Sequence, residues 1–216
     1  MKRIILLLVL VSSLGFAQET VVTDVPFGYH MHDGFYLSLS GGPATGVITL
    51  DATNFIFKKM EFNGAGYMAD LKVGVTLSEE QSLILSFDMI NRFISNPSVT
   101  MDGKSVSATS SFQVSDFLIG FGITKYFMPV NIFITTSFGV SGFEIGVNGS
   151  KAYSGNGFAL QAKVGKEWWI WDDWGLGLAA GLAYASADDQ EDPDFPKYSG
   201  KLSTTKLFVE LSVSFN

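Results

Sequence analysis

The sequence predicts an all-β protein, an eight-stranded antiparallel up-and-down transmembrane β-barrel. Three observations lead to this prediction. Apolar residues alternate with polar or small ones over segments of about ten residues, the connections between these segments are alternately short and long, and the tryptophans gather at one short connection. Together these features are typical of a chain that crosses a bacterial outer membrane as a closed sheet.

The beginning of the chain predicts a secretory signal peptide. Lys2 and Arg3 precede an apolar run over residues 4–11, and Gly15-Phe16-Ala17 supplies a small-x-small cleavage site. A membrane anchor helix would need ~20 apolar residues, and this run is far shorter. We therefore expect a signal peptide over residues 1–17, a periplasmic lead-in over residues 18–33 and an outer-membrane barrel over residues 34–216.

Composition limits the chemistry and the partners. The 216 residues are 47% hydrophobic, 14% aromatic and 16% charged, which is enough to bury one core as one domain. The absence of cysteine excludes disulfides, thiolate metal sites and a lipidated N-terminal cysteine. The formal net charge is −7, and loss of Lys2 and Arg3 makes it more negative. An acidic chain without a basic stripe is not expected to bind nucleic acid.

In the first half of the chain, strands are expected at residues 34–41, 67–77, 82–93 and 113–124. The segment 67–77 shows the pattern most clearly. Every second residue from Tyr67 to Leu77 is apolar, and the residues between them are mostly polar or small. Because a strand places successive side chains on opposite faces, this segment has one apolar and one polar face.

In the second half, strands are expected at residues 131–145, 158–170, 174–185 and 206–215. The segment 174–185 alternates bulky residues with glycine and alanine, and 206–215 alternates apolar with polar residues. Lys166 lies on the apolar side of 158–170, close enough to the tryptophans to extend its ammonium to the membrane surface. The segment 131–145 is less regular, because residues 132–134 are apolar on both faces. Each predicted strand is near or above the ~9–11 residues that cross a membrane.

The connections predict which end of the barrel faces which side. Short turns are expected at residues 78–81, 125–130 and 171–173. Long loops are expected at about 42–63, 94–112, 146–156 and 188–203. Outer-membrane barrels have short periplasmic turns and long extracellular loops, so both termini are expected in the periplasm.

Aromatic residues gather at the short-turn end and predict a girdle at the periplasmic membrane surface. Its expected members are Tyr126, Phe127, Trp168, Trp169, Trp171, Trp174 and Phe215.

The main alternative is a soluble lipocalin-like barrel, which has an apolar interior and a polar exterior. The glycine and alanine face of 174–185 argues against it, because the opposite choice would crowd several leucines into a narrow lumen. The polar faces also carry charges of both signs in similar number, as a closed interior requires. The expected lumen network comprises Asp70, Lys72, Asp88, Arg92, Asp116, Lys163, Glu167, Lys206 and Glu210. A barrel of this size is filled by side chains, so a plugged lumen rather than an aqueous channel is expected.

Three motifs carry a resemblance to known proteins: the hairpin at residues 120–131, the run at 165–169 and the run at 173–177. With them, residues 34–216 resemble the small outer-membrane β-barrel families typified by the OmpA transmembrane domain, OmpX and OmpW. The last strand resembles the sorting signal read by the barrel-assembly machinery, although its aromatic residue, Phe215, is penultimate. The resemblance implies a fold, a lipid and lipopolysaccharide environment and assistance from that machinery. It implies no activity.

Two clusters were weighed as binding sites. His30 and His32, with Asp33, could hold a metal loosely, but nothing nearby completes a ligand set, so a solvated periplasmic lead-in is the preferred interpretation. The acidic segment 188–194 could bind calcium or bridge to lipopolysaccharide phosphates, but its spacing matches no EF-hand, and a solvated loop is preferred. No catalytic residue, metal or cofactor is expected. A lipid-A-modifying enzyme would need its histidine at the outer rim, opposite to the expected position of both histidines.

Two functions remain open at this point. The first is a structural or surface-interaction role, in which four extracellular loops contact lipopolysaccharide, neighbouring cells or host molecules. The second is an OmpW-like passive transporter of small hydrophobic compounds with a lateral opening. An apolar patch in the upper lumen would favour transport, and Phe133 and Phe143 are the aromatic candidates on that face of the fifth strand. The sequence identifies no surface ligand.

Overall fold

The computed structural model describes residue 32 and residues 34–53, 58–77, 82–106, 111–189 and 199–215, all within one compact unit, Met31–Asn216. The strands are β1 (Phe35–Thr53), β2 (Lys59–Thr76), β3 (Leu83–Ser95), β4 (Ser98–Met101), β5 (Lys104–Val106), β6 (Phe112–Phe127), β7 (Ile132–Val147), β8 (Ser150–Trp171), β9 (Trp174–Asp189) and β10 (Ser199–Phe215). Among these residues no helix is long and apolar enough to cross a membrane.

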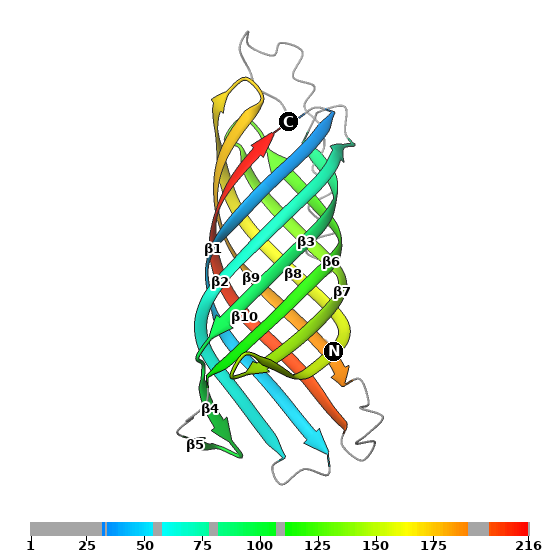
Figure 1. Cartoon of the computed structure of the whole chain (residues 1–216). Coiled ribbons are helices and arrows are strands. Elements are labelled where there is room, and N and C mark those ends of the chain that lie inside the picture. The colour runs from blue at the N-terminus through cyan, green and yellow to red at the C-terminus, as the bar shows by residue number, and fades with distance from the viewer. Residues whose placement is uncertain are drawn as a thin grey trace, which may run out of the picture. The chain divides into compact units, whose positions relative to one another are not determined.

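Eight of the described strands close into an antiparallel barrel, which confirms the predicted fold class (Figure 1). Each strand pairs with its neighbour in the chain order β1-β2-β3-β6-β7-β8-β9-β10, and β10 returns to pair with β1. The hairpin β4–β5 lies outside the ring and continues the sheet beside β2, from Met60↔Met101 to Asn63↔Ser98. It projects at the end of the barrel opposite the C-terminus.

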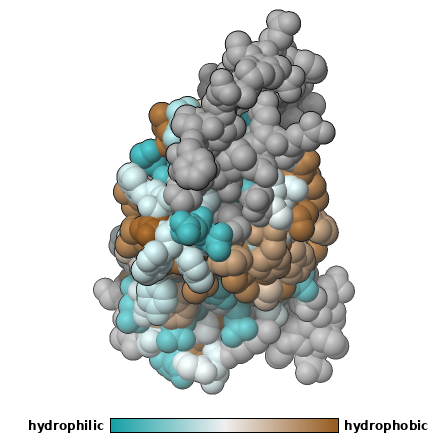
Figure 2. All heavy atoms as spheres, turned by 90° about the horizontal axis from the view of Figure 1, so that it is seen from above, coloured by the Kyte–Doolittle hydropathy of each residue, from teal (hydrophilic) through white to brown (hydrophobic). Residues whose placement is uncertain are grey.

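The alternation along each strand sorts the side chains between wall and lumen as predicted. On β10, Leu211 is 62% exposed whereas its neighbour Glu210 is 1% exposed. On β9, the bulky residues point outward and the glycine and alanine residues, except Ala180, point inward. Hydrophobic residues therefore cover the flank of the barrel. In the view from above they appear at the sides of the molecule (Figure 2). The arrangement is the inverse of a lipocalin, because the charges are inside and the aliphatic side chains outside.

The expected extent of the long loops is corrected, because β-strands occupy many of the residues that were expected in loops. β1 and β2 stay paired as far as Asp51↔Lys59, inside the expected loop 42–63. The expected loop 94–112 contains the β4–β5 hairpin. In the expected loop 146–156, β7 and β8 are joined at Asn148-Gly149, where φ is 52° and 81°. A two-residue hairpin turn needs such positive φ values at both positions, and asparagine and glycine tolerate them best. The connection from β9 to β10 runs from Asp189 to Ser199, which is also shorter than expected.

The extra strand length has a physical reason. On β1 the outward residues become mostly polar from Thr45, with Thr49 and Asp51 following and Val47 as the apolar exception. The predicted strands ended at this change, because the pattern sought was an apolar outward face. Backbone pairing does not end there, since a strand can leave the membrane and continue in water. We call residues 45–53 of β1, 59–65 of β2 and β4 the outer section.

In the outer section the polarity of the barrel is reversed. Most of its outward side chains, such as Asp51 and Asn63, are polar and exposed, whereas its inward side chains, such as Ile48 and Phe62, are apolar and buried. This is the arrangement that water outside the wall favours. The outer apolar cluster comprises Ala44, Ile48, Leu50, Met60, Phe62, Met68, Ile90, Ile94, Val99, Val114, Leu118, Phe143, Ile145, Ala159, Ala183, Ala185, Ala187, Leu202 and Phe208.

A second set of aromatic residues lies at the long-loop end of the apolar outer wall, and it was not predicted from the sequence. The last large apolar outward side chain is aromatic on five strands, namely Tyr67, Phe93, Phe117, Phe158 and Tyr184. The ring centroids are 5.4 Å apart in Tyr67–Phe93 and 5.9 Å apart in Phe158–Tyr184. The signal was present in the sequence, since each of these residues stands next to the change between apolar and polar outward residues on its strand.

Candidate functional site: the charged lumen and its floor

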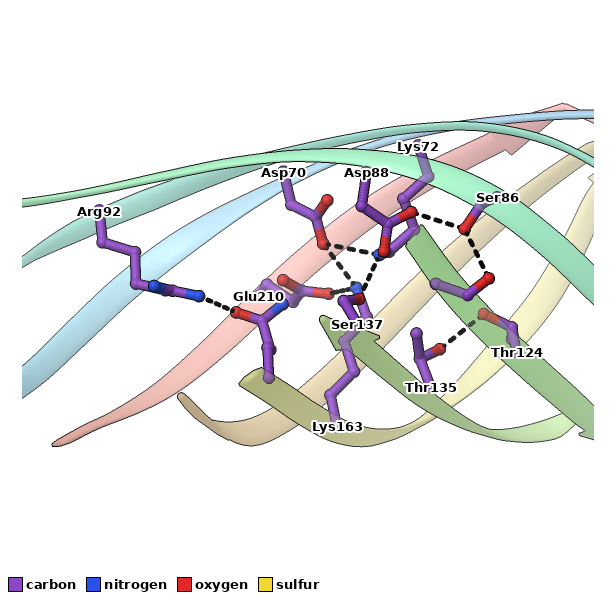
Figure 3. A network of polar contacts seen from close by, with 12 residues as sticks. Asp70, Lys72, Ser86, Asp88, Arg92, Thr124, Thr135, Ser137, Lys163 and Glu210 are labelled. Atoms are coloured by element: carbon purple, nitrogen blue, oxygen red, sulfur yellow. Dashed lines mark hydrogen bonds and ion pairs between the residues drawn. The ribbon is translucent and has the colours of Figure 1, made fainter. Parts of the chain in front are cut away.

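The inward faces of β2, β3, β8 and β10 bring a group of charged residues together in the middle of the lumen (Figure 3). Lys163 Nζ on β8 lies 3.1 Å from Asp70 Oδ2 on β2 and also contacts Glu210 on β10. Lys72 Nζ lies 3.5 Å from Asp70 Oδ2 and contacts Asp88 on β3. We call these five residues the central ion-pair group. It joins opposite walls of the barrel.

A second group of charges lies next to the first. Arg92 Nη1 on β3 is 2.5 Å from Asp116 Oδ2 on β6, and Lys206 on β10 contacts the other oxygen of Asp116. Arg92 also donates from Nη2 to Gln161 Oε1 on β8, at 3.0 Å. Both groups are almost completely buried. Because each charge has an opposite charge beside it, the desolvation of these groups is offset by pairing.

Small polar side chains complete the network, and the sequence analysis did not include them. Ser86 Oγ donates to Asp88 at 2.5 Å, and Ser137 Oγ accepts from Lys72 Nζ at 3.0 Å. Gly122 provides the room for Asp88, because a Cβ at position 122 would collide with that carboxylate. These residues lie on the inward parity of their strands, which was the signal available in the sequence.

Glu167 belongs to a different part of the lumen from the other eight predicted charges. It accepts hydrogen bonds from Ser214 Oγ at 2.6 Å and from Tyr126 Oη at 3.2 Å. Within the described part of the chain it has no lysine or arginine partner. Its nearest cationic candidate is His32, whose Nε2 lies 3.7 Å from Glu167 Oε1. This region, at the short-turn end of the barrel, is called the floor.

The placement of His32 corrects the expectation of a solvated lead-in. His32 is fully buried, and its ring stacks on Tyr126 with a centroid distance of 3.6 Å. Its Nε2 is 3.1 Å from Asn131 Oδ1, and Trp169 lies at 5.0 Å. The other members of the expected cluster, His30 and Asp33, lie outside the described residues. A short segment without periodicity could not show that this ring enters the barrel.

Replacement of His32 by alanine is expected to lower the free energy of unfolding by about 1–3 kcal/mol, because Asn131 Oδ1 would stay buried without its partner. Urea unfolding of protein refolded into lipid vesicles measures this change. Asp173→Ala, in an exposed turn, is the matched control and is expected to have little effect. Equal stability of the two variants would show that His32 does not dock in the floor.

Two of the residues predicted for the periplasmic girdle, Tyr126 and Trp169, do not lie on the outer wall. Phe127, Trp168, Trp171 and Trp174 are exposed on the outer wall or in the turn, and Phe215 packs edge-on against Trp174 at 5.3 Å. Tyr126 is only 1% exposed and Trp169 is half-buried, because both lie on the inward parity and face His32. Lys166 stays at this rim, where it donates to the carbonyl of Val130 and lies 5.6 Å from the Trp168 ring centroid.

No group of three or more histidine, cysteine, aspartate or glutamate side chains that could hold a metal occurs in the described parts of the chain. Of the acidic segment 188–194, Asp188 is described and exposed, and residues 190–194 lie outside the description.

The structure is similar to those of several solved proteins. The outer-membrane protein AlkL superposes with a TM-score of 0.51 at 13% identity, covering 92% of this chain and 97% of that one. Neisserial surface protein A superposes with a TM-score of 0.50 at 12% identity, covering 85% and 97%. The chain has the fold of the small outer-membrane β-barrels.

A further solved structure, the Escherichia coli outer-membrane protease OmpT, gives a TM-score of 0.49 at 8% identity, covering 89% of this chain and 99% of that chain. No protein-family model matches the sequence, and a search of curated proteins finds no match. Likeness at such low identity concerns the fold, so the function is argued from the residues of this chain.

Proposed function

We propose that the protein is an integral outer-membrane barrel with a closed lumen, whose role is structural or depends on contacts made by its outer section. The observation that carries the proposal is the central ion-pair group, which crosses the lumen from β8 to β2. An interior spanned by paired charges holds the barrel wall together but leaves no wide path for solutes. Contacts with the surroundings are then made by the outer surface.

The proposed orientation puts the short turns and both chain termini in the periplasm. The apolar outward band, with aromatic residues at both edges, supports membrane insertion, since Trp and Tyr favour membrane surfaces. The polar outer section then faces the outside, where lipopolysaccharide is the first partner. Cleavage of residues 1–17 and insertion by the barrel-assembly machinery complete the proposed biogenesis in a Gram-negative cell.

The proposal includes no catalysis. Ser214 and His32 both approach Glu167 in the floor, but Ser214 donates to the carboxylate and not to the imidazole. A hydrolytic triad needs the histidine between the serine and the carboxylate, so this order is not that of a triad. Full burial of His32 also keeps substrate away from it.

A second candidate, passive transport of small hydrophobic compounds, is favoured by the outer apolar cluster. Phe143, one of the two aromatic candidates, belongs to this cluster together with Phe62 and Phe208. Phe133, the other, belongs to the floor, where its ring lies 5.4 Å from Tyr126. An apolar upper lumen suits a hydrophobic solute. The charges below it oppose passage through to the floor.

Conductance across planar bilayers tests the closed lumen. The purified protein is expected to insert without giving a large stable current, because the ion pairs block the lumen at membrane level. Insertion is checked separately by protease protection of the barrel in vesicles. A large stable conductance of the unmodified protein would overturn the closed lumen, and entry of a fluorescent hydrophobic probe into protein-containing vesicles above the rate for empty ones would favour transport.

A further inference from the structure

The chain turns inward immediately before β1 and crosses the short-turn mouth of the barrel. Gly34 makes the turn, since its φ is 65°, a left-handed value that glycine adopts at little cost. Its carbonyl accepts a hydrogen bond from Thr76 N on β2 at 2.9 Å. Two residues before Gly34, the His32 ring stacks on Tyr126 of β6 and lies near Trp169 of β8. Two strands separate β1 from β6, and two separate it from β8, so the ring reaches across the mouth.

The groups around this imidazole are held in place by contacts with one another. Glu167 N donates to the carbonyl of Asn131 at 3.0 Å, which joins β8 to the turn between β6 and β7. Tyr126 Oη and Ser214 Oγ both donate to Glu167 Oε2. Gly175 leaves the space for this carboxylate, because a Cβ there would lie 2.5 Å from Glu167 Cδ. The surroundings of the ring are therefore organised without help from the ring itself.

Hydrogen-bond acceptors as well as aromatic rings face the imidazole. His32 Nε2 lies 3.1 Å from Asn131 Oδ1 and 3.7 Å from Glu167 Oε1. Glu167 Oε1 is buried and has no hydrogen-bond partner within the described part of the chain. Tyr126 and Trp169 supply the aromatic surfaces. A flat heterocycle with an N–H donor can stack on these surfaces and donate to the oxygens, whereas a water molecule can only donate.

We propose that His32 is a removable plug of the short-turn mouth, and that the floor is a binding site for an imidazole-type N–H heterocycle, which the chain fills with its own histidine. Residue 32 lies outside the strands, so its departure leaves the paired barrel intact. Gly34 is the point about which it rotates, and Glu167 then meets the water at this mouth. The inference rests on the proposed closed lumen, to which it adds a second closure below the ion pairs.

The test measures how fast a water-soluble maleimide labels a single buried cysteine, which is clean because the sequence contains no cysteine. Ser214→Cys places the thiol in the floor beside Glu167. Ser137→Cys places it within the central ion-pair group instead. Both serines are buried. Each probe is combined with native His32, with His32→Ala and with the exposed-turn control Asp173→Ala. The protein is held in phosphatidylcholine nanodiscs, where both ends of the barrel are accessible to the reagent.

His32→Ala is expected to speed labelling of Ser214→Cys roughly tenfold or more, and Asp173→Ala to change it less than about twofold. Imidazole added to the His32→Ala protein is expected to restore the protection, because the free ring can occupy the vacated site. Ammonium chloride at the same concentration and pH is expected to leave labelling fast, since it has N–H donors but no ring. Ser137→Cys is expected to stay unreactive throughout.

Equal labelling of Ser214→Cys with and without His32 would overturn the plug, as would labelling of both cysteines in the His32→Ala protein, which would show a loosened barrel. Failure of imidazole to protect, or equal protection by ammonium, would overturn the binding site. Rapid labelling of Ser137→Cys with His32 present would instead overturn the proposed closed lumen.

Discussion

Replacement of Lys163 by methionine is expected to lower the free energy of unfolding by about 3–5 kcal/mol, because it removes one partner from a buried ion-pair group. Lys163 Nζ lies 3.1 Å from Asp70 Oδ2 and also contacts Glu210. Methionine has a similar length but no charge, so two buried carboxylates would lose their shared cation. Urea unfolding of the protein in lipid vesicles measures the loss.

A double substitution tests whether Lys163→Met lowers stability because it leaves a buried carboxylate without its lysine. Glu210→Gln added to Lys163→Met is expected to recover part of the stability, because Glu210, which loses its contacting lysine, becomes neutral, whereas Asp70 keeps Lys72 nearby. Glu167→Gln is the control, since Glu167 contacts Tyr126, Ser214 and His32 but not Lys163. Its effect is expected to add to that of Lys163→Met without coupling. If Lys163→Met alone left stability unchanged, the ion-pair group would not hold the barrel together.

Replacement of Val209 by arginine is expected to cost about 2–4 kcal/mol if the position lies near the middle of the bilayer. Val209 is 47% exposed on the outer wall of β10, and it pairs in register with Ala180 of β9. An arginine there would place its guanidinium against lipid tails. The measurement is again the free energy of unfolding from vesicles.

The neighbouring position in β10 supplies the control for Val209. Glu210→Gln faces the lumen and acts through Lys163, so its cost is expected to disappear when Lys163 is methionine. The cost of Val209→Arg is expected to persist in that background, because the lipid face is independent of the ion pairs. Equal dependence of both changes on Lys163 would show that the faces of β10 are wrongly assigned.

Much of the fold was predictable because it follows from the alternation between neighbouring residues. The alternation of Leu71 with Lys72, or of Leu211 with Glu210, assigns each to the lipid or the lumen without knowledge of any other strand. Glycine and alanine opposite leucine on β9 decide which face is inside, since a narrow lumen excludes bulky side chains from every strand at once. The closed barrel, its antiparallel order and the inward direction of the charges follow from such local patterns.

Strand length was less predictable, because an apolar outward face ends where the membrane ends and backbone pairing does not. The outer section was expected as loops for this reason. Its reversed polarity becomes visible when Ile48 on β1 is seen to pair with Phe62 on β2 and both point into the lumen. Alternation is present there too, but its apolar side faces inward.

Which residues face the lumen follows from local alternation in the sequence, whereas which of them meet depends on the assembled barrel. Lys163 is separated from Asp70 by 93 positions, and His32 from Asn131 by 99. The closure of the barrel and the register of its strands set these pairings, because they fix how far each residue lies along the barrel axis. Periodicity predicts whether a side chain points into the lumen or outward, but it does not predict the position of that side chain along the barrel axis. The division of the charges into a central group and a separate Glu167 in the floor therefore depends on the assembled barrel.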